Sequence, residues 1–287
     1  MARPIQDAIM LLGDSITSRQ DVPLSLNALL SETYRRNFDI LNRGLGGYNT
    51  KFYLPSLNEF FLNKEEEKRN FILKRNYQKI KLITIWFGAN DSVLPEFIQY
   101  VPLEEFIKNI NLILEKITFE EKENFENKNN KNDDDDDFLN IILITPPPIL
   151  EKMMENQEFS NQRKLKNTKK YAEGILNIGK QWQEKEKENS NKNKKWKIRT
   201  IDMFNGILND AGGTEDQLKP YFIDGLHLST KGYEVLWKKL LPILENDFKG
   251  RGISPSEIEF TIPDWSILDY SNSNSAVDKM KSPYKRV

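Results

Sequence analysis

Four short β-rich or apolar runs constrain the fold of this chain more than any other feature. They cover residues 8–12, 82–87, 138–145 and 196–204, and a weaker one covers 38–41. Runs without alternation of apolar and polar residues are typical of strands that are buried on both faces. A parallel sheet with helices on either side buries its strands in this way. We therefore expect a parallel sheet of five strands.

Stretches with helical spacing lie between and after these runs. Apolar residues recur at helical intervals in 24–34, 106–117, 161–186 and 229–248. Strands that alternate with helices indicate an α/β fold, in which right-handed crossovers place helices on both faces of the sheet. With 287 residues the chain is near the upper limit for one hydrophobic core, but the single alternating pattern favours one domain. We expect a flavodoxin-like three-layer sandwich over residues 1–250.

Two low-complexity segments interrupt this pattern. Residues 119–137 and 184–195 are rich in Asn, Lys, Asp and Glu and hold little apolar surface, so we expect solvated insertions without a fold. The run of consecutive Asp residues in the first segment is compatible with a cation site, but it lacks the spaced ligands and the central Gly of a calcium loop. A solvated loop is therefore the preferred interpretation.

Residues 251–287 form an extension to the expected domain. The extension contains an apolar patch, FTIPDWSILDY, which we expect to pack on the domain or on a partner. The final residues, about fifteen in number, are mostly polar, and terminal segments are commonly poorly ordered. We expect this end of the chain to be disordered.

The charge balance and the scarcity of Cys and His exclude several classes of function. With 42 Lys and Arg against 43 Asp and Glu, the net charge of −1 argues against a nucleic-acid or anionic-membrane surface and favours a small ligand. The absence of Cys excludes disulfides, thiolate nucleophiles and iron–sulfur clusters, and the single His excludes His-cluster metal sites. The N-terminal run AIMLL is too short for a signal peptide or a membrane span, so we expect an intracellular, cytoplasmic protein.

Glycines and polar residues follow four of the predicted strands. GDSIT follows the first strand, RGLGGYNT the second and GAND the third, whereas DGLHLS comes after the fifth. In open α/β sheets the ligand site lies outside the carboxyl ends of the strands. We therefore expect these four segments to converge at one edge of the sheet.

The residue types in these segments meet the requirements of acyl transfer to a serine hydroxyl. Ser15 is a poor nucleophile until a base removes its proton, and His227 is the single imidazole in the chain. Asp224 lies three positions before His227, where a carboxylate can accept the Nδ1 proton and stabilise the imidazolium. Taken alone, GDS is equally compatible with a helix N-cap, and DxxH with a surface hydrogen-bonded pair. The ordered combination at successive strand ends favours catalysis.

Acyl transfer also requires donors for the oxyanion of the tetrahedral intermediate. The backbone N–H groups of Ser15 and Gly47 and the side-chain amide of Asn90 are the candidates. In isolation, the glycines at 44–47 are compatible with a plain loop and Asn90 with a turn residue. Four residues next to these blocks are candidates for the walls of a substrate pocket, although a core position is the preferred interpretation for the last two. They are Leu45, Tyr48, Trp86 and Phe87.

The four blocks resemble those of the SGNH (GDSL-type) hydrolases, and they occur in the same order over residues 13–229. The stretches GDSIT, NRGLGGYNT, WFGANDS, QYVPLEEFIKNI, LITPPPILE and DGLHLS resemble in particular the isoamyl acetate-hydrolysing esterases of fungi and their relatives. This resemblance implies an intracellular esterase that acts on acetate esters of short alcohols without metal or other cofactor, with a homodimer as a candidate assembly. It places the nucleophile on Ser15, the acid and base on Asp224 and His227, and the oxyanion donors on Gly47, Asn90 and the Ser15 amide.

The chain departs from the pattern of that family at two positions beside the blocks. Gly46 stands where Ser is frequent, and Tyr100 stands where His is common, which suggests a changed pocket shape. The same machinery is compatible with a lysophospholipase, a thioesterase or a sugar O-acetyl esterase. A catalytically silent binding protein on this fold is a further alternative, which the low-complexity segments would suit.

Overall fold

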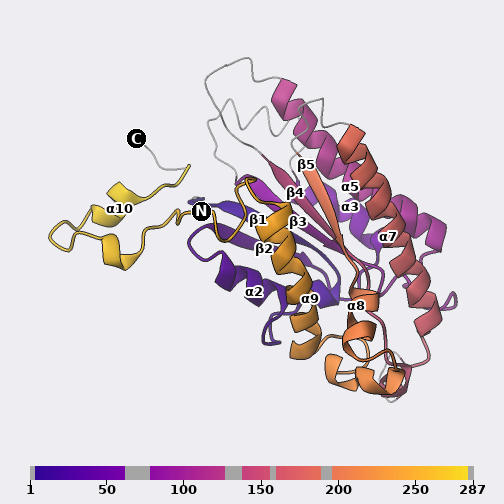
Figure 1. The fold of residues 1–287 in the computed structure, drawn as a ribbon. Coiled ribbons are helices and arrows are strands. Elements are labelled where there is room, and N and C mark those ends of the chain that lie inside the picture. Colours follow the sequence, from indigo (N-terminus) through magenta and orange to yellow (C-terminus); the bar gives the residue numbers. More distant parts are fainter. Residues whose placement is uncertain (1–3, 62–77, 127–137, 156–159, 189–195, 284–287) are drawn as a thin grey trace.

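The computed structural model describes residues 4–61, 78–126, 138–155, 160–188 and 196–283. A five-stranded sheet lies at the centre, and its strands run in the order β2-β1-β3-β4-β5 with every neighbouring pair parallel (Figure 1). The strands are β1 (Asp7–Gly13), β2 (Phe38–Gly44), β3 (Ile80–Trp86), β4 (Leu139–Ile144) and β5 (Trp196–Ile201). The expected α/β fold with a parallel sheet is confirmed.

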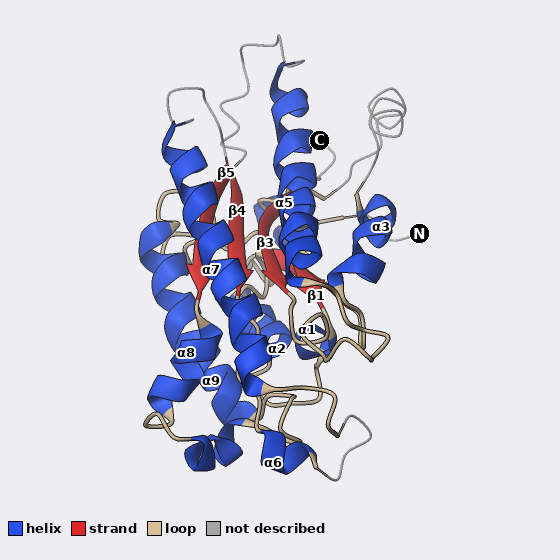
Figure 2. Cartoon of the chain, turned by 90° about the vertical axis from the view of Figure 1, so that its right-hand side faces the viewer, coloured by secondary structure: helices blue, strands red, loops and turns tan. Residues whose placement is uncertain are grey.

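Helices cover both faces of this sheet, so the molecule has three layers (Figures 1 and 2). One face carries α2 (Leu26–Thr33), α8 (Met203–Asp210) and α9 (Thr230–Pro242). The other face carries α3 (Thr50–Phe60), α5 (Leu103–Glu126) and α7 (Leu165–Glu188). The shorter elements are α1 (Ser15–Ser18), α6 (Glu151–Met154), the 3-10 helices η2 (Glu215–Tyr221) and η4 (Trp265–Ile267), the π-helical turn η3 (Ile243–Asp247) and α10 (Ser275–Lys279).

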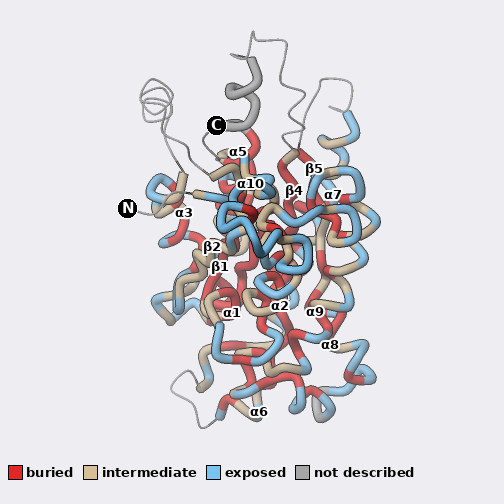
Figure 3. Tube along the Cα trace, turned by 90° about the vertical axis from the view of Figure 1, so that its left-hand side faces the viewer, coloured by how far each residue is buried: buried red, intermediate tan, exposed pale blue. Residues whose placement is uncertain are grey.

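Each central strand contributes side chains to two hydrophobic cores, which explains the lack of alternation in the sequence. In β1, Ile9 and Leu11 pack in the core under α2, α8 and α9, whereas Met10 and Leu12 pack in the core under α3, α5 and α7. Figure 3 shows that buried residues gather in the interior of the molecule, where β1 and β4 lie. Full burial of a Leu or Ile side chain is worth about 1.5–3 kcal/mol. Both faces of the strand therefore stabilise the fold.

One expected strand ends early and one helix was not predicted, and both differences have identifiable local reasons. The strand expected over 196–204 ends at Ile201, because the Asp202 carboxylate accepts a hydrogen bond from the Asn205 N–H (3.0 Å) and caps α8. Helix α3 was not predicted from the spacing of apolar residues. It begins where the Asn49 side chain accepts from the Phe52 N–H (2.9 Å), and it contains Pro55, a residue that normally signals the end of a helix.

The low-complexity segments also differ from the expectation. Helix α5 continues to Glu126 and α7 to Glu188, so residues 119–126 and 184–188 are helical. Extending a helix costs little once its first turns are packed, and Glu and Lys are good helix formers. The remaining parts of these segments, 127–137 and 189–195, lie outside the described residues.

The C-terminal extension returns to the domain beside the turn that joins α2 to β2. Tyr34 donates to the Ile253 carbonyl (2.6 Å), Asn37 donates to the Glu259 carbonyl (2.6 Å), and the Thr261 N–H donates to the Arg36 carbonyl (2.9 Å). The expected packing on the domain is thus present for the start of the apolar patch.

The end of the extension contains a short helix. Residues 275–279 form α10, and the Lys281 N–H donates to the Thr261 carbonyl (2.9 Å). Trp265 and Tyr270 remain 66% and 76% exposed. The last four residues, 284–287, lie outside the described part of the chain. In the ranges that the structure covers, no helix has the length and apolarity needed to span a bilayer.

Candidate active site

Three of the polar blocks begin at the same level of the sheet. In the strand register Gly13 at the end of β1 pairs with Gly44 on β2 and with Trp86 on β3. The strand order places β2 and β3 on opposite sides of β1, so the crevice beside the end of β1 is the topological switch point of the fold. The residues that follow these three strands are therefore brought together by the sheet.

Ser15 stands at the first position of α1, directly after β1. The Asp14 carboxylate accepts from the Ile16 N–H (2.9 Å) and caps this short helix. On its other side, Tyr233 of α9 donates its hydroxyl to the Ile16 carbonyl (2.6 Å). These two contacts fix the turn that presents the half-buried Ser15 side chain.

The loop after β2 lies directly against this turn, and the contact requires glycine. A Cβ added at Gly44 would lie 2.4 Å from the Ser18 nitrogen and 2.9 Å from the Asp14 carbonyl oxygen. These distances are far below van der Waals contact, and the opposing atoms belong to the backbone. The glycine at this position therefore allows the second block to approach the nucleophile.

The segment that carries Asp224 and His227 is a closed loop. The Ile223 N–H donates to the His227 carbonyl (2.9 Å), and an antiparallel bridge joins Phe222 to Leu228. Inside the loop, one carboxylate oxygen of Asp224 accepts from the backbone N–H groups of Leu226 (2.9 Å) and His227 (2.7 Å). These two backbone N–H groups fix the position of the carboxylate.

Ser15, His227 and Asp224 form one hydrogen-bonded chain. The Ser15 Oγ lies 2.9 Å from His227 Nε2, and His227 Nδ1 lies 2.6 Å from Asp224 Oδ2. The His227 and Asp224 side chains are 17% and 18% exposed, so both are partly accessible to solvent. A hydroxyl, an imidazole and a carboxylate in this order have the geometry of a nucleophile, its general base and the group that orients the base.

The environment of Asp224 keeps its carboxylate ionised. Partial burial acts to raise its pKa, but the hydrogen bonds from the His227 ring and from the two backbone N–H groups outweigh burial and lower the pKa to about 2. A carboxylate that stays charged at neutral pH can hold the Nδ1 proton of the imidazole and stabilise the imidazolium.

Asn90 and Gly47 lie on loops that contact each other. The Asn90 amide nitrogen donates to the Tyr48 carbonyl (2.9 Å), next to Gly47 in the second block. Gly47 itself has a positive φ of 77°, and its carbonyl accepts from the Gln99 side chain (2.6 Å). Arg163 donates to the Asn90 Oδ1 (2.8 Å). Asn90 and Gly47 were predicted from the sequence as oxyanion donors. Gln99 lies in the quoted stretch QYVPLEEFIKNI but was not singled out, and Arg163 lies in no motif.

Two of the four expected pocket residues are buried in the cores, and the other two are partly exposed. Trp86 and Phe87 are only 1% and 0% exposed, because they alternate along the strand direction into the two cores. The pocket assignment is therefore corrected for both, and the core interpretation holds. Leu45 is partly buried against the core under α3. Tyr48 is 38% exposed, and its backbone carbonyl is the group that accepts the hydrogen bond from Asn90. These two remain candidates for pocket walls.

Two buried carboxyl groups lie under the site. Burial raises the pKa of Asp14 to about 7, and the nearby Asp91 raises it further although the Ile16 N–H opposes the shift. Burial likewise raises the pKa of Asp91 to about 6, against hydrogen bonds that its Oδ1 accepts from the Thr50 N–H (2.8 Å) and hydroxyl (2.5 Å). Both groups therefore hold a proton more tightly in the folded than in the unfolded chain.

Asp14→Asn should stabilise the protein at pH 8 but not at pH 4. Between the unfolded pKa of 3.8 and the folded pKa of about 7, only the unfolded chain releases the proton, so the free energy of unfolding of the parent falls as pH rises through this window. The difference of about three pKa units corresponds to at most about 4 kcal/mol above pH 7. An Asn oxygen can still accept from Ile16, which preserves the cap.

Urea unfolding of the parent and of Asp14→Asn at pH 4, 6 and 8 measures this effect. Asp91→Asn should show the same sign over a narrower window, which ends near its pKa of about 6. A stability difference that is constant across these pH values would contradict the assignment of raised pKa values to these groups.

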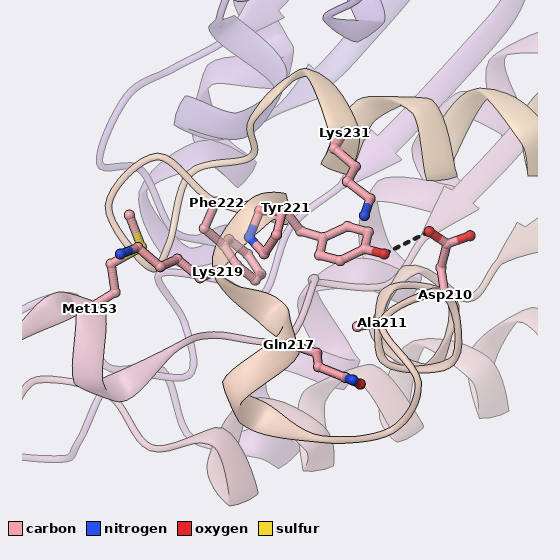
Figure 4. Close-up of a pocket in the computed structure, with 9 residues that line it drawn as sticks. Met153, Asp210, Ala211, Gln217, Lys219, Tyr221, Phe222 and Lys231 are labelled. Atoms are coloured by element: carbon pink, nitrogen blue, oxygen red, sulfur yellow. Dashed lines mark hydrogen bonds between the residues drawn. The ribbon is translucent and has the colours of Figure 1, made fainter.

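A separate open pocket of about 780 Å³ lies beside η2, and no triad residue lines it (Figure 4). Its polar side chains contact one another: Tyr221 donates to Asp210 (2.8 Å), and the Lys231 ammonium lies 4.5 Å from the centre of the Tyr221 ring. Among the described residues, no group of three His, Cys, Asp or Glu side chains is placed to hold a metal ion.

Comparisons with known proteins identify the family of the chain. A family model described as GDSL-like lipase/acylhydrolase matches residues 9–240. A GDSL esterase/lipase of Arabidopsis thaliana is 27% identical across 94% of this chain and 97% of its own length. The isoamyl acetate-hydrolyzing esterase of Saccharomyces cerevisiae is 25% identical across 92% of this chain and 96% of its own length. The human isoamyl acetate-hydrolyzing esterase 1 homolog is 28% identical across 83% of this chain and 81% of its own length.

A solved structure shows the same fold. The lipase/acylhydrolase from Enterococcus faecalis superposes with a TM-score of 0.53 at 21% identity, over 86% of this chain and 97% of that one. The family match over residues 9–240 covers all four blocks. Three of them follow β1, β2 and β3, and the fourth is the loop that carries Asp224 and His227. The chain therefore belongs to the GDSL-like lipase/acylhydrolase family, whose members are carboxylic ester hydrolases.

Proposed function

We infer that this protein is a serine esterase that hydrolyses short-chain carboxylic esters, in particular acetate esters of short alcohols such as isoamyl acetate. The observation that carries the proposal is the contact between the Ser15 hydroxyl and His227 Nε2 (2.9 Å), with Asp224 on the other ring nitrogen. A hydroxyl that donates to an imidazole oriented by a carboxylate is prepared for attack on a carbonyl carbon.

The reaction proceeds in two halves through an acyl-enzyme. His227 removes the Ser15 proton as Oγ attacks the ester carbonyl, and the resulting oxyanion accepts hydrogen bonds from the backbone N–H groups of Ser15 and Gly47 and from the Asn90 amide. When the C–O bond to the alcohol breaks, His227 donates the proton to the leaving oxygen. Water then attacks the acyl-enzyme with His227 again as base, which releases the carboxylic acid and restores the Ser15 hydroxyl.

The names of the yeast and human relatives support isoamyl acetate as a substrate. The two candidate wall residues are consistent with a small apolar alcohol, because Leu45 is aliphatic and Tyr48 presents a partly exposed ring. An apolar pocket discriminates by about 1–3 kcal/mol per methylene group, so the chain-length preference is measurable with simple esters.

The kcat/KM for acetyl esters should exceed that for octanoyl esters by at least about tenfold. Rates for p-nitrophenyl acetate, butyrate, octanoate and palmitate test this, together with isoamyl acetate and an acetylated sugar. A long-chain optimum would indicate a lysophospholipase or thioesterase, and a preference for the acetylated sugar would indicate a sugar O-acetyl esterase.

A fluorophosphonate probe separates the esterase from a silent binding protein. The parent should be labelled covalently, and Ser15→Ala should not be labelled. A matched control is Ser18→Ala, which removes another hydroxyl from the same short helix, one that donates to the Ser15 carbonyl (3.0 Å). If the parent resisted the probe, catalysis by Ser15 would have to be abandoned.

A further inference from the structure

Arg163 is a buried cation that contacts the third block of the site. Its side chain is nearly enclosed, with the residue only 3% exposed, and it precedes α7. Nη2 donates to the Asn90 Oδ1 (2.8 Å) and Nε donates to the Ala89 carbonyl (3.2 Å). The planar guanidinium thus bonds two successive residues of the GAND block, an arrangement that a lysine could not reproduce.

These contacts determine how the Asn90 amide is oriented. A guanidinium has only donors, so the amide oxygen must face Arg163. The Tyr48 carbonyl is an acceptor, so the amide nitrogen must face it, as the 2.9 Å distance shows. The nitrogen carries two hydrogens and this carbonyl takes one. Within the described part of the chain, the second N–H is left for an oxygen of the substrate.

The charge of Arg163 acts in the same direction as its hydrogen bonds. Burial lowers the pKa of the guanidinium to about 10, against the opposing effect of the Asp14 and Asp224 carboxylates, so the group stays protonated at neutral pH. A fixed positive charge behind the amide oxygen polarises the amide and makes its N–H a stronger donor. Preorganised donors and charges of this kind stabilise the negative oxygen of a tetrahedral intermediate.

We propose that Arg163 is a positioning residue for the oxyanion hole: it holds the Asn90 oxygen away from the substrate and directs the amide N–H toward the developing oxyanion. This inference rests on the proposed function, because an oxyanion forms only in acyl transfer. It assigns to Arg163 an effect on the transition state through Asn90, rather than a contact with the substrate.

A purely structural role predicts a different result, because Arg163 also holds the start of α7 against the loop after β3. In that case its loss would destabilise the protein and impair catalysis independently of Asn90. Arg251 offers a matched control at the opposite end of the sheet. It donates to the Asn140 Oδ1 (2.6 Å) and to the Leu139 carbonyl (3.2 Å). Arg251 therefore bonds an Asn side-chain oxygen and the carbonyl of the preceding residue, as Arg163 does, but it does so away from the site.

A double-mutant cycle on Arg163 and Asn90 distinguishes the two roles. Arg163→Met should lower kcat by about 10²-fold with KM changed less than about threefold, and Asn90→Ala should lower kcat by about 10²–10³-fold. In the Asn90→Ala background, Arg163→Met should lower kcat by less than about a further threefold, because the amide that Arg163 positions is absent. Arg251→Met should leave kcat within about threefold in both backgrounds.

The measurements are kcat and KM on the best ester of the series, the rate of Ser15 phosphonylation by a fluorophosphonate, and unfolding in urea. If Arg163→Met does not fold, Arg163→Lys serves instead. It should lower kcat by a smaller factor, and this loss should also disappear when Asn90→Ala is present. Losses that multiply in the double variant would overturn the proposal while leaving the esterase function intact. A parent that neither hydrolyses esters nor reacts with the probe would overturn the esterase function and this inference together.

Discussion

His227→Ala should lower kcat for acetate esters by about 10⁶-fold, and Ser15→Ala should do the same. The reason is that the two side chains act as one unit, in which the imidazole lies 2.9 Å from the hydroxyl whose proton it must take. The chain contains no second His that could substitute as base. Rates with p-nitrophenyl acetate at a fixed pH measure the effect, and each variant should unfold in urea as the parent does.

The double variant gives a sharper test of this unit. Because either single loss already removes nucleophilic attack, the Ser15→Ala, His227→Ala double variant should be no slower than either single variant within about threefold. Ser18→Ala, in the same short helix, should retain the parent rate. A His227→Ala protein that hydrolysed the ester as fast as the parent would show that another group is the base.

Asp224→Asn should lower kcat by about 10⁴-fold and leave KM nearly unchanged. The backbone determines which way the new amide faces. Its oxygen must take the position of Oδ1, which accepts from the Leu226 and His227 N–H groups, so its NH₂ must face His227 Nδ1. The imidazole then has to carry its proton on Nε2, the nitrogen that faces Ser15, and it cannot accept the proton of the hydroxyl.

Asp202→Asn is the matched control for this prediction, because Asp202 also accepts a backbone N–H at a turn but lies at the start of α8. It should keep the parent kcat. An NMR spectrum of the single imidazole would report the tautomer in Asp224→Asn directly. If that variant kept kcat within about tenfold of the parent, orientation of the base by Asp224 would be excluded as a major contribution.

The parts of the site that follow a strand could be predicted because two strong patterns coincide. Strands such as β1 and β3 are recognisable as continuous apolar runs, and parallel strands end at one edge of the sheet. A polar residue after such a run must therefore lie at that edge. Ser15 and Asn90 follow β1 and β3 in this way, and the resemblance to a known family adds the ordering of the blocks.

Other parts of the site could not be predicted, because their roles depend on packing in three dimensions. Arg163 is one of 42 cationic residues and stands in a polar stretch that resembles any helix start. Trp86 and Phe87 border the third block in sequence, but the pleat directs both side chains into the cores. Proximity along the chain thus identified the loop but did not show which neighbouring side chains turn into the cores.

The helical ends of α5 and α7 illustrate a second limit. A lack of apolar residues shows that a segment contributes little to a core, but it does not exclude a helix that an adjoining packed segment has already started. Residues 119–126 and 184–188 continue helices in this way. Composition therefore predicted correctly that these residues add little to the core, but it predicted loops where residues 119–126 and 184–188 are helical.

The contact between Tyr233 and the Ile16 carbonyl has a consequence for biosynthesis. It ties the last large helix of the domain to the turn that bears the nucleophile, while the hydroxyl and its base are 212 positions apart in the chain. A nascent polypeptide on the ribosome therefore cannot form the Ser15–His227 contact until the segment through α9 has emerged. If Ser15 and His227 act as proposed, recovery of ester hydrolysis after refolding would report that α9 and the loop with His227 have docked on the first strand.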